Sequence, residues 1–416
     1  MNSRCTEAKE EPKNGRVVQV PHGDSFVELP VGENAEITEL IPPYIEPLSY
    51  QQIVRSIRNP TGQMPLSEIA VGKKNVVVIL ENATRPLNTR LVASLVVEEL
   101  SKARVARDSI TFLFANGAHK DMEEYNDKAK LGEQFQNFRV VDHDCEGELV
   151  NLGRTSLGSP ILINPLVVEA DLRIAIGTIV PHYGDGVSGG AKILFPGCAG
   201  LEWIFNNHSL KRGDFGQIDN EWRNDTEESA GKVGIDFLVN AVLNYRREII
   251  GLYCGDWIKA HREGVDLSLK ASAVKRPDKA DFCIASSCPF DLNFIQTLKA
   301  VAVARTVIKD DGAYVLLTSC RQGLGSHRWL SDEKMSEIRH RQNADYDSTM
   351  QEIVYSTHLS EAELHSYCPK QVRLINDAST LRQMIASLDR PGKKGVILPY
   401  APITVLQKRP HVAVWQ

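Results

Sequence analysis

The strongest constraint on the fold is a run of apolar, mostly β-branched residues, VVVIL, at Val76–Leu80. Such a run is typical of a strand that is buried on both faces, as in parallel sheets covered by helices. Apolar residues at helical spacing follow it, at Leu91, Leu95, Val96 and Leu100. A strand followed by a helix is the unit of right-handed βαβ connections, so this segment predicts the beginning of a mostly parallel sheet.

The same alternation continues along the chain. Further strands are expected at residues 110–114, 138–142 and 172–180, with a helix after Asp121 and another opened by the glycine-rich segment that follows Val180. After a linker at 276–281 the pattern restarts, with strands at 282–287 and 313–319 and a helix over 296–304. We therefore predict an α/β fold of two α/β lobes, with mostly parallel, helix-covered sheets and the active site in the cleft between them.

The predicted division of the chain has three parts. Residues 1–15 are expected to be a mobile tail, residues 16–270 an N-terminal α/β domain, and residues 271–416 a C-terminal α/β domain. The boundary is placed near residue 270 because the strand and helix pattern restarts shortly after it.

Composition excludes several classes of protein. Hydrophobic residues make up 42% and charged residues 24% of the chain, which is ordinary for a globular protein. The formal net charge of −5 offers no basic surface for nucleic acid. Apolar runs end well before the about 18 residues that a membrane span needs, and the polar N-terminus is unlike a secretory signal. The eight cysteines form no CxxC pair, which indicates reduced thiols in a cytoplasmic protein.

Each strong strand is followed directly by a cluster of polar residues. The clusters are ENATRP at 81–86, ANGAH at 115–119, PHYGDGVSGGAK at 181–192 and CPFDLNFIQTLK at 288–299. Ligands of open α/β sheets bind outside the carboxyl ends of the strands. The four clusters are therefore expected to converge on one site.

Two of these clusters carry residues suited to an anionic ligand. Arg85 follows Asn82 and Thr84 at a strand end, and its planar guanidinium can bind two oxygens of a carboxylate or phosphate at once. The alternative is a turn with a surface arginine. His119 lies in a loop open to a ligand, although a lone loop histidine is more often structural or solvated.

The glycine-rich segment is a stronger signal. Its glycines let the backbone approach a ligand closely, and amides at the beginning of a helix favour an anion. The segment is not a Walker A loop, because Ile193 follows Lys192, and it is not a dinucleotide fingerprint, because it follows the third strand and is preceded by His182.

Three histidines can supply a metal ligand and two bases, namely His119, His182 and His208. Their spacing matches no common zinc pattern, so nickel or another transition metal is equally admissible. Gln296 and Lys299 lie three residues apart on a predicted helix and share a face, where they can hold a carboxylate or form a solvated pair. The residues around His327 indicate no role beyond that of an ordinary surface residue.

Together these segments resemble the nickel-pincer nucleotide-dependent lactate racemase family. The resemblance rests on NATRP, ANGAHK, VDHD, NLGRTSLGSP, PHYGDGVSGGAKILFPG, NNH, CPFDLNFIQTLK and SCRQGLGSH, in this order between Asn82 and His327. Its most specific part is the block from His182 to His208, where the spacings on both sides of Lys192 agree with the family.

The resemblance implies a racemase or epimerase of 2-hydroxy acids, an isomerase that works by hydride transfer through a 2-keto acid. It implies a nickel-pincer nucleotide, with His208 as the metal ligand and covalent attachment at Lys192 as an open option. By position, His119 and His182 are similar to the two acid/base residues of the family. Two groups complete the expected site. The substrate-binding residues are Arg85, Gln296, Lys299 and Asp185, and the cofactor-binding residues besides Lys192 are Asn82, Thr84, Ser188, Gly189 and Gly190.

The sequence departs from the family pattern in three places. Asn82 stands where an acidic residue is usual, Gly184 and Asp185 replace a bulkier segment after His182, and Ile295 replaces a tyrosine. Gly184 is expected to enlarge the pocket and Asp185 to receive a substrate hydroxyl. We therefore expect a substrate other than or larger than lactate.

Two other functions stay open at this point. One is a metal-dependent hydrolase or lyase that uses the same histidines, and the other is a non-catalytic protein that binds the nickel nucleotide. The expected partner is a small 2-hydroxy acid, with no nucleic acid and no membrane. The number of chains that assemble is left open, with a homodimer as one option.

Overall fold

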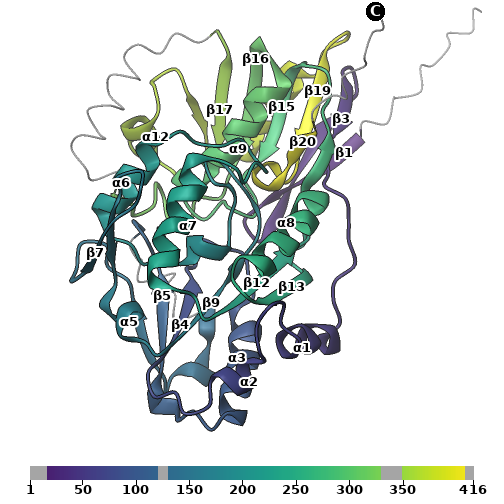
Figure 1. The fold of residues 1–416 in the computed structure, drawn as a ribbon. Helices are drawn as coiled ribbons and strands as arrows, with labels where there is room; N and C mark the ends of the chain where they lie inside the picture. The colour runs from purple at the N-terminus through teal and green to yellow at the C-terminus, as the bar shows by residue number, and fades with distance from the viewer. Residues whose placement is uncertain (1–15, 120–129, 329–348, 408–416) are drawn as a thin grey trace, which may run out of the picture.

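A computed structural model describes residues 16–119, 130–328 and 349–407. Over these residues the chain forms two six-stranded sheets with helices packed against them (Figure 1). The α/β prediction is confirmed. The tail expected at residues 1–15 and most of the helix expected after Asp121 lie outside the described residues.

The first sheet contains the strands that the sequence predicts in the first half of the chain. Its order is β13-β12-β9-β4-β5-β6, and all neighbours are parallel except β12 and β13. The strands are β4 (Val76–Glu81), β5 (Ile110–Ala115), β6 (Arg139–Asp142), β9 (Leu172–Thr178), β12 (Phe237–Leu243) and β13 (Ile249–Gly255).

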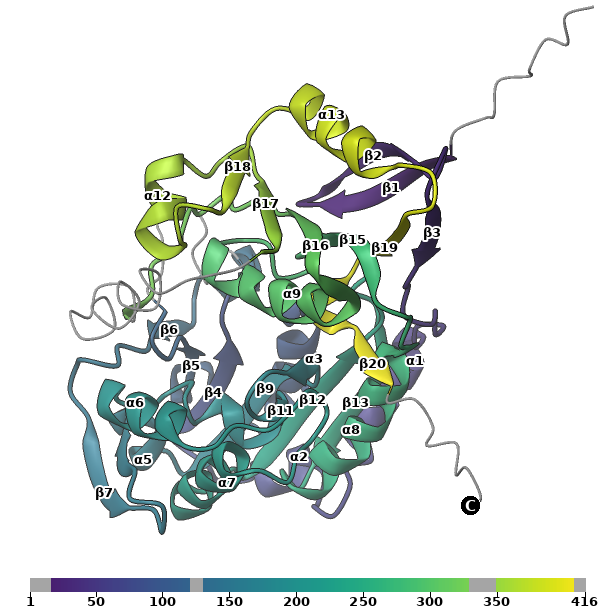
Figure 2. The ribbon, with the colours of Figure 1, turned by 90° about the horizontal axis from the view of Figure 1, so that it is seen from above.

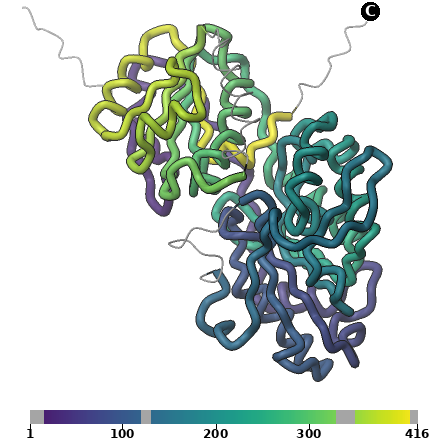
Figure 3. The backbone as a smooth tube through the Cα atoms, turned by 90° about the vertical axis from the view of Figure 1, so that its left-hand side faces the viewer, coloured from purple at the N-terminus to yellow at the C-terminus, as the bar shows by residue number. Residues whose placement is uncertain are grey.

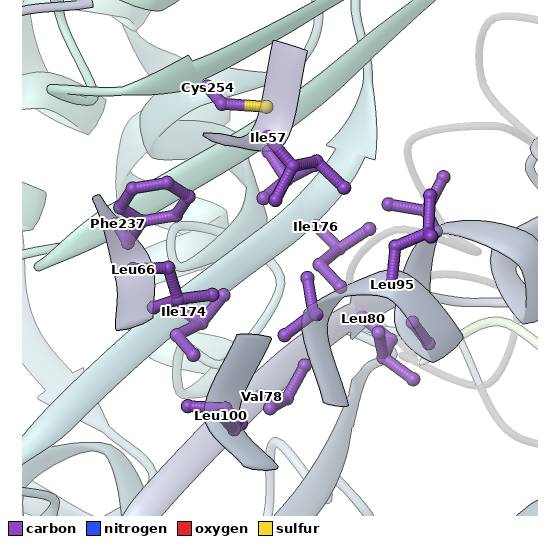
Figure 4. Packing of buried hydrophobic residues seen from close by; sticks show 14 of the residues in the cluster. Ile57, Leu66, Val78, Leu80, Leu95, Leu100, Ile174, Ile176, Phe237 and Cys254 are labelled. Carbon is purple, nitrogen blue, oxygen red and sulfur yellow. The ribbon is translucent and has the colours of Figure 1, made fainter. Parts of the chain in front are cut away.

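The central strand of this sheet, β4, is buried at every position. Val76, Val78 and Leu80 enter the core on one face, while Val77 and Ile79 enter the core on the other. The first of these cores contains side chains of α1 (Tyr50–Arg58), α2 (Leu66–Ile69) and α3 (Thr89–Lys102) packed on the strands (Figure 4). Burial on both faces explains why the sequence of this strand is an uninterrupted apolar run.

The second sheet is parallel throughout and has the order β18-β17-β16-β15-β19-β3. Its strands are β3 (Glu36–Glu39), β15 (Ala280–Ser286), β16 (Ile308–Leu317), β17 (Gln351–Tyr355), β18 (Arg373–Ile375) and β19 (Lys394–Leu398). Its helices are α9 (Phe294–Val307), α12 (Glu361–Tyr367) and α13 (Ala378–Leu388).

The N-terminal segment belongs with the second sheet. Strand β3 pairs with β19, and the hairpin of β1 (Arg16–His22) and β2 (Ser25–Val31) packs in the same core as α13. Figures 2 and 3 show this purple segment among the green and yellow parts of the chain. Strand β3 therefore pairs with the second sheet although it lies within residues 16–270, and the division of the chain into domains near residue 270 stays a prediction.

The remaining elements connect or cover the sheets. They are β7 (Val150–Arg154) paired with β8 (Pro160–Ile163), β14 (Ala273–Lys275) paired with β20 (Val405–Gln407), α5 (Pro165–Glu169), α6 (Leu201–Ser209), α7 (Glu221–Val233), α8 (Lys259–Ser272) and short 3₁₀ turns at 107–109, 133–135 and 401–403. Among the described residues, no helix is long and apolar enough to cross a membrane.

The glycine-rich segment differs from its prediction. It forms a short hairpin of β10 (Pro181–His182) and β11 (Gly186–Val187), followed by a 3₁₀ turn at Gly190–Ile193 instead of the expected α-helix. Its glycines adopt positive φ angles, which favour tight turns over helix.

We expect Asp389→Ala to destabilise the second sheet. The Asp389 carboxylate accepts backbone N–H groups of Glu33, Asn34 and Ala35 at 3.0, 3.3 and 2.7 Å, immediately before β3. Loss of this acceptor should lower the free energy of unfolding by about 1–3 kcal/mol, measured by denaturant unfolding. Asp310→Asn, at a side chain that is 94% exposed, is the control and should stay within about 0.5 kcal/mol of the wild type. Equal stability of Asp389→Ala and the wild type would contradict this role.

Candidate active site

The Gln296 side chain contacts residues that follow strands of both sheets. Gln296 lies in the first turn of α9, where the N-cap residue Asn293 accepts its backbone N–H at 3.4 Å. Its Oε1 accepts hydrogen bonds from Arg85 Nη1 at 3.2 Å and from Lys299 Nζ at 2.8 Å. Arg85 follows β4 in the first sheet, so the predicted convergence of these strand ends is confirmed for these residues.

The two cations fix the orientation of the Gln296 amide. Because Arg85 and Lys299 can only donate, they require the oxygen of the amide on their side. The amide nitrogen then faces His119 Nε2, 3.3 Å away, and donates to it. His119 Nε2 is therefore the unprotonated nitrogen of a neutral ring.

Arg85 and Lys299 form a site for an anion. Both side chains are only partly exposed, and no carboxylate of the described residues lies within ion-pair distance of either. Both cations also lie over the ring of Phe290, Lys299 Nζ at 4.2 Å and Arg85 Cζ at 5.7 Å from its centroid. Burial, followed by the charges of Arg85 and Lys192, holds the pKa of Lys299 well below its usual value. A bound carboxylate would relieve this repulsion.

Asn82 and Thr84 orient Arg85 in this structure. Asn82 Oδ1 accepts from Thr84 N at 3.2 Å and from Thr84 Oγ1 at 2.6 Å. Thr84 Oγ1 in turn accepts from Arg85 Nη1 at 3.0 Å. Asn82 stands where the family usually has an acidic residue. A carboxylate is nevertheless present one residue earlier, at Glu81, and it is close enough to raise the pKa of Arg85 against the larger effect of burial, which lowers it.

His119 has a histidine neighbour, His327, whose sequence context indicated only an ordinary surface residue. Its ring meets that of His327 edge-on, with centroids 4.5 Å apart, and the backbones of the two residues form an antiparallel bridge. Burial, then the charges of His327, Arg85 and Lys299, lower the pKa of His119 well below 6.5. His119 is therefore neutral at physiological pH and suited to accept a proton.

His182, Asp185 and Lys192 form a second polar group. Lys192 Nζ makes a close ion pair with Asp185 Oδ2, and His182 Nδ1 lies 3.5 Å from the same oxygen. Burial, then the charges of Lys192 and Lys299, lower the pKa of His182 well below its usual value. The electrostatic effect of Lys299 on His182 relates this group to the anion site.

Gly184 does not enlarge a pocket, which corrects the expectation from the sequence. A Cβ at Gly184 would lie 2.4 Å from the ring of Trp222, so that ring already fills the space. Asp185 is 1% exposed and bound to Lys192, a geometry that does not favour the expected contact with a substrate hydroxyl.

Trp222, on α7, also contacts His208 near the end of α6, with ring centroids 4.3 Å apart. His208 Nδ1 donates to the carbonyl of Ile204 at 2.7 Å, which leaves Nε2 as the unprotonated nitrogen. Burial, then the charge of Lys192, lowers the pKa of His208 to about 4. A neutral imidazole held in this way is the form that ligates metals.

The polar groups of the glycine-rich loop are engaged within the protein. Ser188 Oγ donates to the Thr178 carbonyl at 2.9 Å, and Gly190 N donates to Asn240 Oδ1 at 2.7 Å. The fully buried Arg223 binds the carbonyls of Val187 and Gly189. These contacts fix the loop through the protein's own groups.

The described residues offer few protein ligands for a metal. Among the described residues, no group of three or more His, Cys, Asp or Glu side chains is placed to bind a metal ion. One neutral histidine beside a buried lysine amine fits a metal that arrives with donor atoms of its own. The nucleotide that the resemblance implies would be a group of this kind, and His208 and Lys192 are compatible with it.

Sequence patterns missed Trp222, Arg223, Phe290 and His327. Phe290 was inside a segment already singled out, at the turn before α9. His327 ends the segment SCRQGLGSH, which is part of the family resemblance, but no role followed from that position. Trp222 and Arg223 carried no signal, because their place in the site depends on packing between distant segments.

Comparison with known proteins identifies the family. Residues 22–216 match the model of the lactate racemase N-terminal domain. Lactate racemase of Thermoanaerobacterium thermosaccharolyticum is 31% identical over 302 residues, which cover 69% of this chain and 70% of that protein. The lactate racemase of Lactiplantibacillus plantarum is 32% identical over 298 residues, or 68% and 69% of the two chains. The chain belongs to the lactate racemase family.

Solved structures agree with this assignment at the level of the fold. The lactate racemase apoprotein of T. thermosaccharolyticum superposes with a TM-score of 0.73 at 24% identity, over 94% of this chain and all of that one. A Thermotoga maritima protein gives a TM-score of 0.62 at 19% identity, over 88% of this chain. Membership of the lactate racemase family makes the chain an isomerase, and the resemblance seen in the sequence is confirmed.

We expect Gln296→Glu to raise the pKa of His119. In this family member the Gln296 amide donates to His119 Nε2, whereas a carboxylate there can only accept, and so stabilises the protonated ring. The pKa, followed by NMR titration of the His119 ring, should move upward from its depressed value. Gln296→Met removes the hydrogen bond without adding charge and should give no such rise. Identical titration of His119 in Gln296→Glu and Gln296→Met would contradict the assigned orientation.

Proposed function

We propose that this lactate racemase family member inverts the hydroxyl-bearing C2 of a 2-hydroxy acid through a 2-keto acid. The observation that carries the proposal is a pair of cations, Arg85 and Lys299, next to the neutral ring of His119. Neither cation forms an ion pair with a carboxylate of the described residues. A 2-hydroxy acid presents a carboxylate next to a hydroxyl, which matches a cationic clamp beside a proton acceptor.

The nickel-pincer nucleotide is the cofactor that we propose for this site. His208 would bind the metal through Nε2, and Lys192 would hold the nucleotide, with covalent attachment as an option. Asn82, Thr84, Ser188, Gly189 and Gly190 would border it. When bound, the nucleotide would supply an acceptor for the hydride of C2.

The chain's own residues would do the rest of the chemistry. Arg85 and Lys299 would hold the substrate carboxylate, with Gln296 between them. His119 and His182 would each take or return the hydroxyl proton, one for each enantiomer, because inversion presents the hydroxyl in two positions. Both rings have depressed pKa values and are therefore available as bases at neutral pH.

The substrate is proposed to be a 2-hydroxy acid other than or larger than lactate. Two of the reasons for this, the space at Gly184 and the hydroxyl contact of Asp185, do not agree with the geometry described above. Ile295 in place of a tyrosine next to Gln296 still supports it. A chiral panel of 2-hydroxy acids that includes lactate tests this part.

We expect protein produced together with a working cofactor-synthesis pathway to contain stoichiometric nickel. His208→Ala should lose nickel, because it removes the one ring nitrogen assigned to the metal. His358→Ala is the control and should keep nickel, because that ring bonds to the Ser319 carbonyl and is not assigned to the metal. Nickel is measured by elemental analysis of the purified protein. Intact mass with and without Lys192→Ala reports any covalent attachment. Protein free of nickel and nucleotide under these conditions would refute the cofactor assignment.

Hydride transfer predicts retention of a C2 label. A substrate carrying deuterium at C2, racemised in ordinary water, should give product that keeps the deuterium, because hydride leaves C2 and returns without meeting solvent. Mass spectrometry of the separated enantiomers measures this. Loss of deuterium to solvent would indicate proton abstraction at C2 and would exclude the proposed route.

A further inference from the structure

One carboxylate oxygen is shared by two groups of the proposed site. Asp185 Oδ2 makes a close ion pair with Lys192 Nζ, and it also lies 3.5 Å from His182 Nδ1. Among the described residues His182 Nδ1 is buried and has no hydrogen-bond partner. Buried polar atoms are almost always satisfied, so this unsatisfied nitrogen next to a carboxylate requires an explanation.

The backbone keeps Asp185 between these two partners. His182 and Gly186 are paired across the β10–β11 hairpin, with Asp185 in its turn. A Cβ at Gly186 would lie 1.9 Å from the Gln217 carbonyl, and Gly213 N donates to the Gly184 carbonyl at 2.7 Å, so the turn is packed tightly on both sides. This packing restrains the backbone that carries the Asp185 carboxylate.

The other carboxylate oxygen has only a weak contact. Asp185 Oδ1 lies 3.5 Å from Thr226 Oγ1. Burial opposes the charge of Asp185, but Lys192 and then Arg223 outweigh it and keep the pKa of the carboxyl below its usual value. Asp185 is therefore a carboxylate, and Lys192 holds the oxygen that His182 Nδ1 approaches.

We propose that Asp185 is a positioning residue for His182 and that the charge of Lys192 controls it. While Lys192 is an ammonium ion, it holds Oδ2, and His182 Nδ1 stays unsatisfied. When Nζ is uncharged, Oδ2 is released to accept the Nδ1–H of His182. That hydrogen bond fixes the tautomer in which Nε2 is unprotonated, as an aspartate does for a catalytic histidine.

The inference deepens the proposed function, since His182 is there one of two bases. It makes the tautomer of His182, and so its ability to act as a base through Nε2, depend on the charge of Lys192. Lys192 is the residue assigned to hold the nucleotide. His119 has no such carboxylate; its tautomer is set by the amide of Gln296. The two bases would thus be prepared by different means.

The test is the tautomer of His182 in protein that contains neither cofactor nor substrate. Nitrogen-15 NMR of histidine-labelled protein distinguishes the protonated from the bare ring nitrogen, and His182→Gln identifies the signals. Lys192→Met should shift His182 toward the form with the proton on Nδ1. Asp185→Asn should shift it away from that form, because its amide can donate to Nδ1.

The double variant Lys192→Met with Asp185→Asn decides whether the effect passes through Asp185. It should give the same His182 signals as Asp185→Asn alone. Lys192 is proposed to act on His182 only by holding the Asp185 carboxylate, so removing its charge should have no further effect once that carboxylate is gone. Lys309→Met, which removes a cation that pairs with Asp281, is the control and should leave His182 unchanged. Thermal unfolding of each variant verifies that it is folded.

Unchanged His182 signals in both Lys192→Met and Asp185→Asn would overturn the proposal. So would equal shifts in Lys192→Met and in the double variant. Neither result depends on nickel or on racemisation, so failure here is distinguishable from failure of the proposed function. In cofactor-loaded enzyme, Asp185→Asn should lower kcat about tenfold with little change in KM, because Asp185 acts on the base and not on the substrate.

Discussion

The site depends on two positive charges held close together without a carboxylate to neutralise them. Arg85, in the loop after β4 of the first sheet, and Lys299, on α9 beside the second sheet, both donate to one amide oxygen and lie over one aromatic ring. Their charges help to keep His119 and His182 neutral and leave a place where an anion is favoured. The orientation of Gln296, and with it the tautomer of His119, follows from the same pair. An anionic substrate would complete this arrangement.

Much of the fold and part of the site could be predicted from the sequence. Strands such as β4 were predictable because burial on both faces leaves an unbroken apolar run, and a parallel sheet brings strand ends to one edge. That rule was enough to expect Arg85, His119 and Gln296 near one another. The rule needs only local sequence, because Arg85 and His119 lie in the loops after β4 and β5, and Gln296 lies in the first turn of the helix that follows β15.

What could not be predicted depends on side chains that arrive from elsewhere. Gly184 suggested open space, but Trp222 on α7 fills it. Asp185 suggested a free carboxylate, but Lys192 turns back from the 3₁₀ turn to bind it. A glycine in a loop allows space next to it, and an acidic residue allows a charge contact. Which side chain fills that space or makes that contact depends on packing between segments that lie far apart in the sequence.

The membership of β3 in the second sheet has a consequence for the order in which the protein can form. Strands of the first sheet all lie between residues 76 and 255, so this part can assemble while the ribosome is still making the remainder. The second sheet needs both ends of the chain: Glu33 and Asp389, bonded before β3, are 356 positions apart in the sequence. Strand β3 can therefore pair only after β19 has been synthesised. Since Gln296 and Lys299 belong to that second part, the cationic centre is among the last features of the molecule to exist.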